Sequence, residues 1–567
     1  MAKPVPVGCV PARRPARSFP RSPPQKTAEH RSVVTCVLRA FWSAFDSLPC
    51  PLNIVIYLLF FPLLELLFRH RVRRYLALRS SQSTPHDEAD TAHIIDFWKT
   101  VLREDGVDGI VRGWFLGEGE LRTGNLLDLI GWTLFAKSAS DLDGVQTRTA
   151  NRILGDMLAV VPPCAFPEGK NPNRVCMTHT LGPLSSCWKP LFFYLCVHVM
   201  RAAAATVLRR RGFELRTFNS LSYWHHPGTP AAAAMAASGA ADHAACPAAP
   251  AAAPLPIVVL HGVGGFPQYV PLALDIRSMR PQAPVFMPIL PHCSMLYPAF
   301  EPPPPLDTNA DIVENLVDAL RAHAPAGGAP PPPPRAAFLG HSLGTALFAS
   351  VAKQHPQVVA AAELVDPICF LLYHSNVLYN FLYRQPVPLR HGPRQGLHFG
   401  YWFRLALHYM LRQEPTIQSC FRREFWWGRH WLHASHLRAF PSRVVLSARD
   451  AIVPSPLVHA YLLTHSPQGG SRRDVEMHER WHHGWSMLWA PSRRRLIASL
   501  CALIDDSAPP LALPEATAVE VAASAIAPAP SPAPVSVEVG EALDQHLPCR
   551  DRRTRTRSPL RRRAAVA

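Results

Sequence analysis

The sequence lacks most signatures that would assign it to a specialised class of protein. Its 13 cysteines include no Cys-x-x-Cys pair, so their spacing indicates neither a zinc site nor a disulfide framework and favours a reducing compartment. Acidic residues are absent from residues 1–28, and the segment 549–563 holds eight arginines against one aspartate. The net charge of +17 therefore lies mostly at the two ends. Because no recognition motif accompanies it, we do not expect nucleic acid as a partner.

The two ends also have little that would form a packed core. Residues 1–32 are rich in Arg, Ser and Pro, a composition that fits a disordered basic arm and an organellar transit peptide equally well. Residues 507–567 form an Ala/Pro-rich stretch followed by arginines, and we expect them to be disordered.

Long hydrophobic runs are scarce as well. Residues 51–68, PLNIVIYLLFFPLLELLF, are near the minimum length for crossing a bilayer and are interrupted by Pro62 and Glu65. We predict that residues 33–78 are a membrane-associated helical segment that spans the bilayer or lies in its surface; the alternative is a buried helix. More arginines follow the run than precede it, so the positive-inside tendency favours a cytosolic or stromal position for the rest of the chain.

What is present is an alternation of strand and helix patterns. Residues 79–228 indicate a mostly helical N-terminal extension, in which the apolar stretch 190–207 is predicted to be a core helix. Residues 229–255 are an Ala/Pro linker. From 256 to 506, short apolar runs alternate with helical patterns, which predicts an α/β fold with a mostly parallel sheet and helices on both faces.

One pentapeptide lies at a junction between a strand pattern and a helical pattern. Residues 340–344 read Gly-His-Ser-Leu-Gly between an apolar strand and a helical pattern. A nucleophile elbow needs such a sharp turn, with small residues on either side of the nucleophile so that strand and helix pass closely. Gly340 and Gly344 occupy those positions. The motif alone is suggestive, and its context makes Ser342 the candidate nucleophile.

A serine needs a histidine to accept its proton and a carboxylate to orient that histidine. Asp450 follows the apolar strand in VVLSARDAIVP and is the preferred acid. Asp366, in LVDP at the end of an earlier strand, is the alternative acid or braces a loop. In HHGW, His483 is the preferred base because the glycine after it lets the loop turn sharply, and His482 is the alternative.

The negative charge that develops on an attacked carbonyl requires two backbone N–H donors. One is expected at Leu343, which follows the nucleophile and begins a helix whose dipole assists. The second is expected at Val263 or Gly264 in HGVGG, the Gly-rich loop after the first strand.

Four segments, VVLHGVGG, FLGHSLG, LSARDAIVP and HHGWSML, occur in this order and resemble the α/β-hydrolase superfamily of serine esterases and lipases over about residues 256–505. Three others, WFLGEGELRTGNLLDLIGWTLF, LVDPICFLLYHSNVLYNFLYRQP and FRREFWW, resemble a group of poorly characterised membrane-associated fungal and algal α/β-hydrolases. The resemblance implies the α/β-hydrolase fold and serine-hydrolase chemistry but defines no substrate.

Residues 367–442 stand where α/β-hydrolases insert a cap over the active site, and 16 of these 76 residues are aromatic. An aromatic helical cap suits an apolar acyl chain, although most of these side chains are expected to pack the cap onto the body. His430, His433 and His436 fall three residues apart. We interpret them as a polar helix face, because no carboxylate nearby completes a set of zinc ligands.

These observations favour a membrane-associated serine hydrolase that cleaves a lipid or other apolar ester through an acyl-enzyme on Ser342, with no cofactor or metal. An acyltransferase that uses the same triad and a catalytically silent binding or scaffold protein of this fold are the alternatives. Nothing in the sequence indicates an oligomeric state.

Overall fold

A computed structural model describes much of the chain between residues 50 and 506. The arm 1–32, most of the linker 229–255 and the tail 507–567 lie outside the described residues, so the predictions for these segments stay predictions. The described ranges are 50–80, 94–95, 110–159, 161, 165–229, 254–295, 309–323, 334–385, 405–465 and 473–506.

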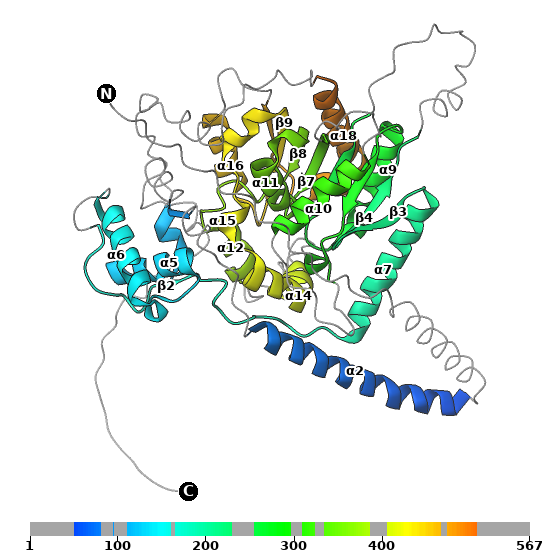
Figure 1. The fold of residues 1–567 in the computed structure, drawn as a ribbon. Helices are drawn as coiled ribbons and strands as arrows, with labels where there is room; N and C mark the ends of the chain where they lie inside the picture. Colours follow the sequence, from blue (N-terminus) through cyan, green and yellow to red (C-terminus); the bar gives the residue numbers. More distant parts are fainter. Residues whose placement is uncertain are drawn as a thin grey trace, which may run out of the picture. The chain divides into compact units, whose positions relative to one another are not determined.

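The centre of the fold is an eight-stranded sheet with the strand order β10-β9-β8-β7-β5-β6-β4-β3 (Figure 1). Adjacent strands from β10 to β6 pair in parallel, whereas β4 is antiparallel to both β6 and β3. The strands are β3 (Glu214–Phe218), β4 (Leu221–His226), β5 (Ile257–Leu260), β6 (Val285–Pro288), β7 (Ala336–His341), β8 (Val359–Val365), β9 (Ser442–Ser447) and β10 (Arg473–His478).

The sheet begins earlier in the chain than the sequence patterns predict. We predicted a helical extension up to residue 228 and an α/β domain from 256, but β3 and β4 belong to the sheet. β3 is the edge strand and is largely exposed, so its residues lack the continuous apolar run that marks the central strands, and β4 lies between β3 and β6.

The central strands are apolar on both sides because both faces of the sheet are covered. In β5, Val258 and Leu260 pack into one hydrophobic core, and Ile257 and Val259 pack into the other. The first core also contains residues of α10 (Asn309–Ala322), α11 (Gly344–Gln354) and α16 (Ser455–Thr464). The second contains residues of α9 (Val270–Met279) and α18 (Ala490–Asp505).

The insert after β8 consists of short helical turns, and it is fastened to the N-terminal extension by tryptophans. Trp426 and Trp427 are fully buried. The Trp426 ring lies 5.4 Å from Trp132, and the Trp427 ring lies 6.1 Å from Trp114. These cap aromatics therefore serve packing. The turns are α12 (Asn376–Leu378), η6 (Tyr379–Tyr383), η9 (Leu407–Arg412), α14 (Pro415–Ser419), η10 (Cys420–Glu424), α15 (Trp427–His430) and η11 (Ala434–Ala439).

The extension itself is mostly helical. Its helices α5 (Thr123–Phe135) and α6 (Gly144–Ala159) pack against each other, next to the short pair β1 (Phe115–Leu116) and β2 (Val175–Cys176).

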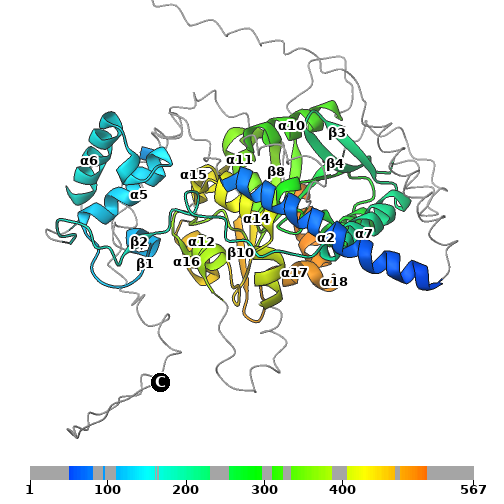
Figure 2. The same ribbon diagram turned by 90° about the horizontal axis from the view of Figure 1, so that it is seen from below.

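Two long helices, α2 (Cys50–Ser80) and α7 (Leu191–Arg210), pack together (Figure 2). The predicted membrane run 51–68 lies in α2, and the stretch 190–207 lies in α7. The prediction of a core helix for 190–207 is wrong, because only 17% of the apolar window of α7 is buried. Among the described residues, α7 is the one helix that is long and apolar enough to cross a membrane.

We expect Glu424→Ala to destabilise the fold by about 3–5 kcal/mol, because it removes the carboxylate from a buried ion pair and leaves the cation behind. Arg79 Nη1 lies 3.0 Å from Glu424 Oε1, and the two side chains are 5% and 6% exposed. The free energy of unfolding in urea measures the loss. Glu214→Ala, which breaks an exposed pair with Arg216, should leave it unchanged. Equal values for the two variants would contradict the expectation.

Candidate functional site

Ser342 lies at a sharp turn between β7 and α11, with a backbone φ of +52°. This left-handed conformation is strained for a residue with a side chain, and it is the conformation that a nucleophile elbow requires. A Cβ atom on Gly344 would lie 2.1 Å from the carbonyl oxygen of Leu260, so only glycine fits there. Gly340 is less constrained, because its nearest contact would be 3.4 Å away.

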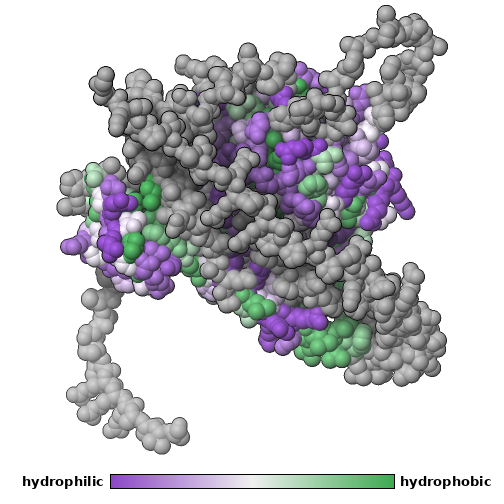
Figure 3. All heavy atoms as spheres, in the orientation of Figure 1, coloured by the Kyte–Doolittle hydropathy of each residue, from purple (hydrophilic) through white to green (hydrophobic). Residues whose placement is uncertain are grey.

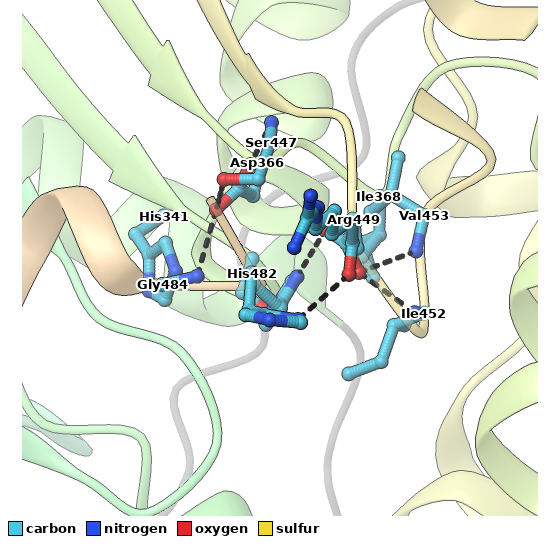
Figure 4. Close-up of polar contacts among 12 residues, drawn as sticks. His341, Asp366, Ile368, Ser447, Arg449, Ile452, Val453, His482 and Gly484 are labelled. Atoms are coloured by element: carbon cyan, nitrogen blue, oxygen red, sulfur yellow. Dashed lines mark hydrogen bonds and ion pairs between the residues drawn. The ribbon is translucent and has the colours of Figure 1, made fainter. Parts of the chain in front are cut away.

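The structure brings Ser342, His483 and Asp450 together. His483 Nε2 lies 2.8 Å from Ser342 Oγ, and His483 Nδ1 lies 2.6 Å from Asp450 Oδ2. The Asp450 carboxylate accepts a hydrogen bond from Nδ1–H, which keeps that proton on Nδ1 and leaves Nε2 free to accept the serine proton. The other oxygen of Asp450 accepts the backbone N–H groups of Ile452 and Val453 at 2.7 and 3.0 Å, which fixes the carboxylate (Figure 4).

The electrostatics at His483 favour a positive charge. Burial by itself would lower the pKa of His483, but the charge of Asp450, its hydrogen bond and then the charge of Asp366 raise that pKa above its usual range. An imidazole in this setting is stabilised after it accepts a proton.

Asp366 braces the histidine loop and makes no hydrogen bond to the imidazole. Its Oδ1 accepts the N–H of Ser447 at 2.8 Å, and its Oδ2 accepts the Ser447 hydroxyl at 3.1 Å and the Gly484 N–H at 2.7 Å (Figure 4). Burial raises the pKa of this carboxyl. Asp366 thus holds the residue directly after His483 in place.

The alternative base, His482, points elsewhere. Its Nδ1 lies 3.1 Å from the carbonyl oxygen of Arg449, and its ring centroid lies 5.5 Å from that of Trp485. No contact with Ser342 is found for it among the described residues.

The side chains of Asp366, Asp450 and His483 also form a group whose candidate metal-ligand atoms lie within 4.8 Å of one another. Their donor atoms are already used, however. Both imidazole nitrogens face the serine and Asp450, and both carboxylates accept hydrogen bonds from neighbouring N–H groups. The arrangement therefore suits the movement of a proton better than the coordination of an ion.

Two of the three candidate oxyanion donors have free N–H groups. In the described part of the chain, the backbone N–H groups of Leu343 and Val263 have no hydrogen-bond partner. Gly264 differs from the prediction, because its N–H donates to the carbonyl oxygen of Cys293 at 2.7 Å. The loop that contains Gly262 and Val263 lies close to Ser342, since a Cβ atom on Gly262 would be 3.1 Å from Ser342 Cβ.

A tyrosine that sequence reasoning missed holds this loop. The hydroxyl of Tyr269, in the turn η3 (Phe266–Tyr269), accepts the N–H of Gly262 at 2.7 Å and donates to His341 Nδ1. Burial, and then the nearby His483, keep the pKa of His341 well below its usual range, so His341 is neutral. One hydroxyl thus joins the loop that contains Gly262 and Val263 to His341, the residue before Ser342. No local motif marks Tyr269, because its partner His341 lies 72 residues away.

The strand order, the elbow after β7 and the later positions of the acid and the histidine make this the α/β-hydrolase fold. Among solved structures, the chain is similar to the carboxylesterase CesB (YbfK) from Bacillus subtilis, with 12% sequence identity and a TM-score of 0.33, over 55% of this chain and 99% of that chain. It is also similar to a membrane phospholipase A described as a bacterial virulence factor, with 12% identity and a TM-score of 0.32, over 56% and 93% of the two chains.

A third similar structure is the proline iminopeptidase of Mycobacterium smegmatis, with 17% identity and a TM-score of 0.33, over 52% and 98% of the two chains. These likenesses are distant, so the fold is assigned on strand order and elbow geometry. A scan of protein-family models and a search of curated proteins found no match, and the narrower resemblance to fungal and algal proteins gains no support from them.

We expect Tyr269→Phe to lower the free energy of unfolding by about 1–3 kcal/mol, because it leaves the buried N–H of Gly262 without an acceptor. Urea denaturation measures the change. Tyr223→Phe is the matched control, since the Tyr223 hydroxyl makes only a 3.4 Å contact with His323 Nε2. A loss in the control as large as that in Tyr269→Phe would show that the hydrogen bond to the loop is not the cause.

Proposed function

We propose that the protein is a membrane-associated serine hydrolase that cleaves a lipid or other apolar carboxylic ester through an acyl-enzyme on Ser342. The observation that carries the proposal is the pair of contacts at His483, 2.8 Å to the serine hydroxyl and 2.6 Å to the Asp450 carboxylate. Together they give the hydroxyl of a residue with strained backbone both a base and a means to stabilise the charge on that base.

The reaction follows from these contacts. Ser342 Oγ attacks the ester carbonyl while His483 Nε2 accepts its proton, and Asp450 stabilises the imidazolium. The N–H groups of Leu343 and Val263 bind the oxyanion. His483 then gives its proton to the leaving alcohol, and a water molecule, deprotonated by the same imidazole, releases the acyl group. These residues complete the cycle without a cofactor.

Exposed apolar side chains next to the base support an apolar substrate at a membrane interface. The turn α17 (Trp485–Leu488) begins two residues after His483. Trp485, Leu488 and Trp489 are 45%, 67% and 66% exposed, which is high for such large apolar residues. The apolar, largely exposed helix α7 supports membrane association. The arginines that follow residue 68 suit the anionic lipid of a cytoplasmic leaflet, and so a cytosolic or stromal position for the catalytic domain.

We expect a fluorophosphonate probe to label the wild-type protein and to leave Ser342→Ala unlabelled, because the probe reacts only with an activated serine. Ser222→Ala is the control and should be labelled like the wild type. Ester hydrolysis by Ser342→Ala should fall by roughly 10⁴-fold or more. Absence of label on both proteins would instead support the catalytically silent alternative.

We expect the acid limb of kcat/KM against pH to lie above pH ~6.5, the ordinary pKa of histidine, because Asp450 and Asp366 raise the pKa of His483. Below its pKa the imidazole is protonated and accepts no proton from Ser342, so activity is lost as the pH falls. Asp450→Asn removes the negative charge and should move the limb to lower pH, with a rate loss of roughly 10²–10⁴-fold. An unmoved limb in this variant would argue against Asp450 as the partner of His483.

A further inference from the structure

The composition of α7 does not decide whether this helix crosses a membrane. By length and hydropathy α7 is able to cross a bilayer. A crossing helix would place the chain before it and the chain after it on opposite sides of the membrane.

The chain before α7 is fixed to the cap. Arg423 in η10 donates to the carbonyl oxygens of Thr180 and Gly182 at 2.9 and 3.0 Å, and Cys187 N donates to the carbonyl oxygen of Gln413 at 2.9 Å. Further back, the tryptophan contacts described above join the extension to the same cap.

The chain after α7 is fixed to the sheet. Leu208 is fully buried in the second core, where Ala204 and Ala205 also pack. The Arg209 guanidinium lies 5.5 Å above the Trp224 ring of β4. The chain then continues into β3 and β4 of the sheet. Both ends of α7 are therefore attached to one folded body, and the helix is not able to pass through a membrane without pulling that body apart.

Helix α2 packs against α7 through one polar contact and one hydrophobic cluster. Glu65, the acid that interrupts the apolar run, accepts the N–H of Leu191 at 2.9 Å and so caps the first turn of α7. Val72 and Tyr75 of α2 pack with Tyr194 of α7 in a separate hydrophobic cluster, and Arg79 is paired with Glu424 of the cap.

The outer sides of the two helices carry apolar stripes. On each helix, residues at positions i, i+3 and i+7 share one face, and these side chains are exposed. Figure 3 shows an apolar patch followed by a hydrophilic one along α2. The stripe residues are Phe60 (41% exposed), Leu63 (53%) and Leu67 (54%) on α2, and Phe192 (63%), Leu195 (44%) and Val199 (68%) on α7.

Exposed arginines follow the α2 stripe directly: Arg69, Arg71, Arg73 and Arg74. The one acid between Phe60 and Ser80, Glu65, is used as the helix cap. An apolar stripe followed by a run of exposed arginines complements a bilayer surface that contains anionic lipid.

We propose that α2 and α7 form one in-plane membrane-binding face, defined by these two stripes and the four arginines, which binds the surface of an anionic bilayer without crossing it. This proposal rests on the membrane association in the proposed function and gives it a surface and a topology. It does not depend on the chemistry of Ser342.

Topology is tested with the full chain in sealed membranes. Protease-cleavable tags are placed at the N-terminus, between Glu118 and Gly119 in an exposed turn, and at the C-terminus. All three should be digested from the same side. Digestion of the internal and C-terminal tags from opposite sides would mean that α7 crosses, and an N-terminal tag on the opposite side would mean that α2 crosses. Either result overturns the proposal.

The binding face is tested with vesicles of phosphatidylcholine, with and without phosphatidylserine. The double variant Phe192→Glu/Val199→Glu should partition at least about tenfold more weakly, because it places two carboxylates in the apolar stripe. The matched control, Val175→Glu/Leu215→Glu, changes residues that are 58% and 48% exposed elsewhere and should bind like the wild type. Equal binding of both variants, or an equal loss in both, overturns the proposal.

A milder variant keeps the test decisive if the double variant folds poorly. Arg73→Gln/Arg74→Gln should lose only the phosphatidylserine-dependent part of the binding, by about fivefold for each arginine. Hydrolysis of a short water-soluble ester should be unchanged in all these variants. If the wild-type protein binds vesicles but does not hydrolyse this ester, the result counts against the proposed hydrolase function and leaves the membrane-binding face standing. If the wild type does not bind vesicles and the double variant Phe192→Glu/Val199→Glu has a lower oligomeric state than the wild type, a second copy of the chain covers this face. That result also overturns the proposal.

Discussion

The close approach of α11 to β5 is the constraint on which the rest of the site depends. The carbonyl oxygen of Leu260 lies where any side chain at residue 344 would have to be, so this close approach of helix and strand requires glycine at residue 344. This contact forces the chain to turn within Ser342 and leaves that residue in the left-handed region. The loop that contains Gly262 and Val263 starts from the same strand end. The position of the hydroxyl and the position of the loop are therefore set by one contact.

The two carboxylates near the histidine divide two tasks between them. Asp450 hydrogen-bonds to the ring and supplies most of the opposing charge, whereas Asp366 holds the backbone of Gly484. Both come from strand ends, β9 and β8, so the sheet fixes their spacing. Sequence patterns placed Asp366 at the end of one strand and Asp450 after another, and they preferred Asp450 as the acid. They left Asp366 open as an alternative, because the difference lies in which atom each oxygen meets.

What the sequence predicts well is local. The turn at Ser342, the strands on either side and the order of acid and histidine follow from short patterns, and the structure brings Ser342, Asp450 and His483 together. What it misses depends on distant partners. The strand β3 has a polar, exposed surface, Gly264 is diverted by Cys293, and Tyr269 reaches a histidine 72 residues away. For α7, composition alone does not distinguish a core helix from one with an exposed apolar side.

The cap that Glu65 places on α7 has a consequence for the order of events during synthesis. The acceptor and its donor at Leu191 are 126 residues apart, which corresponds to roughly 6–25 s of translation at typical speeds. For that time the nascent chain presents α2 at the ribosome without its helical partner, with its leucines and phenylalanines open to whatever apolar surface is nearest. Ser342, Asp450 and His483 are synthesised later still, so this apolar helix is complete before any of the three residues that meet at the candidate site.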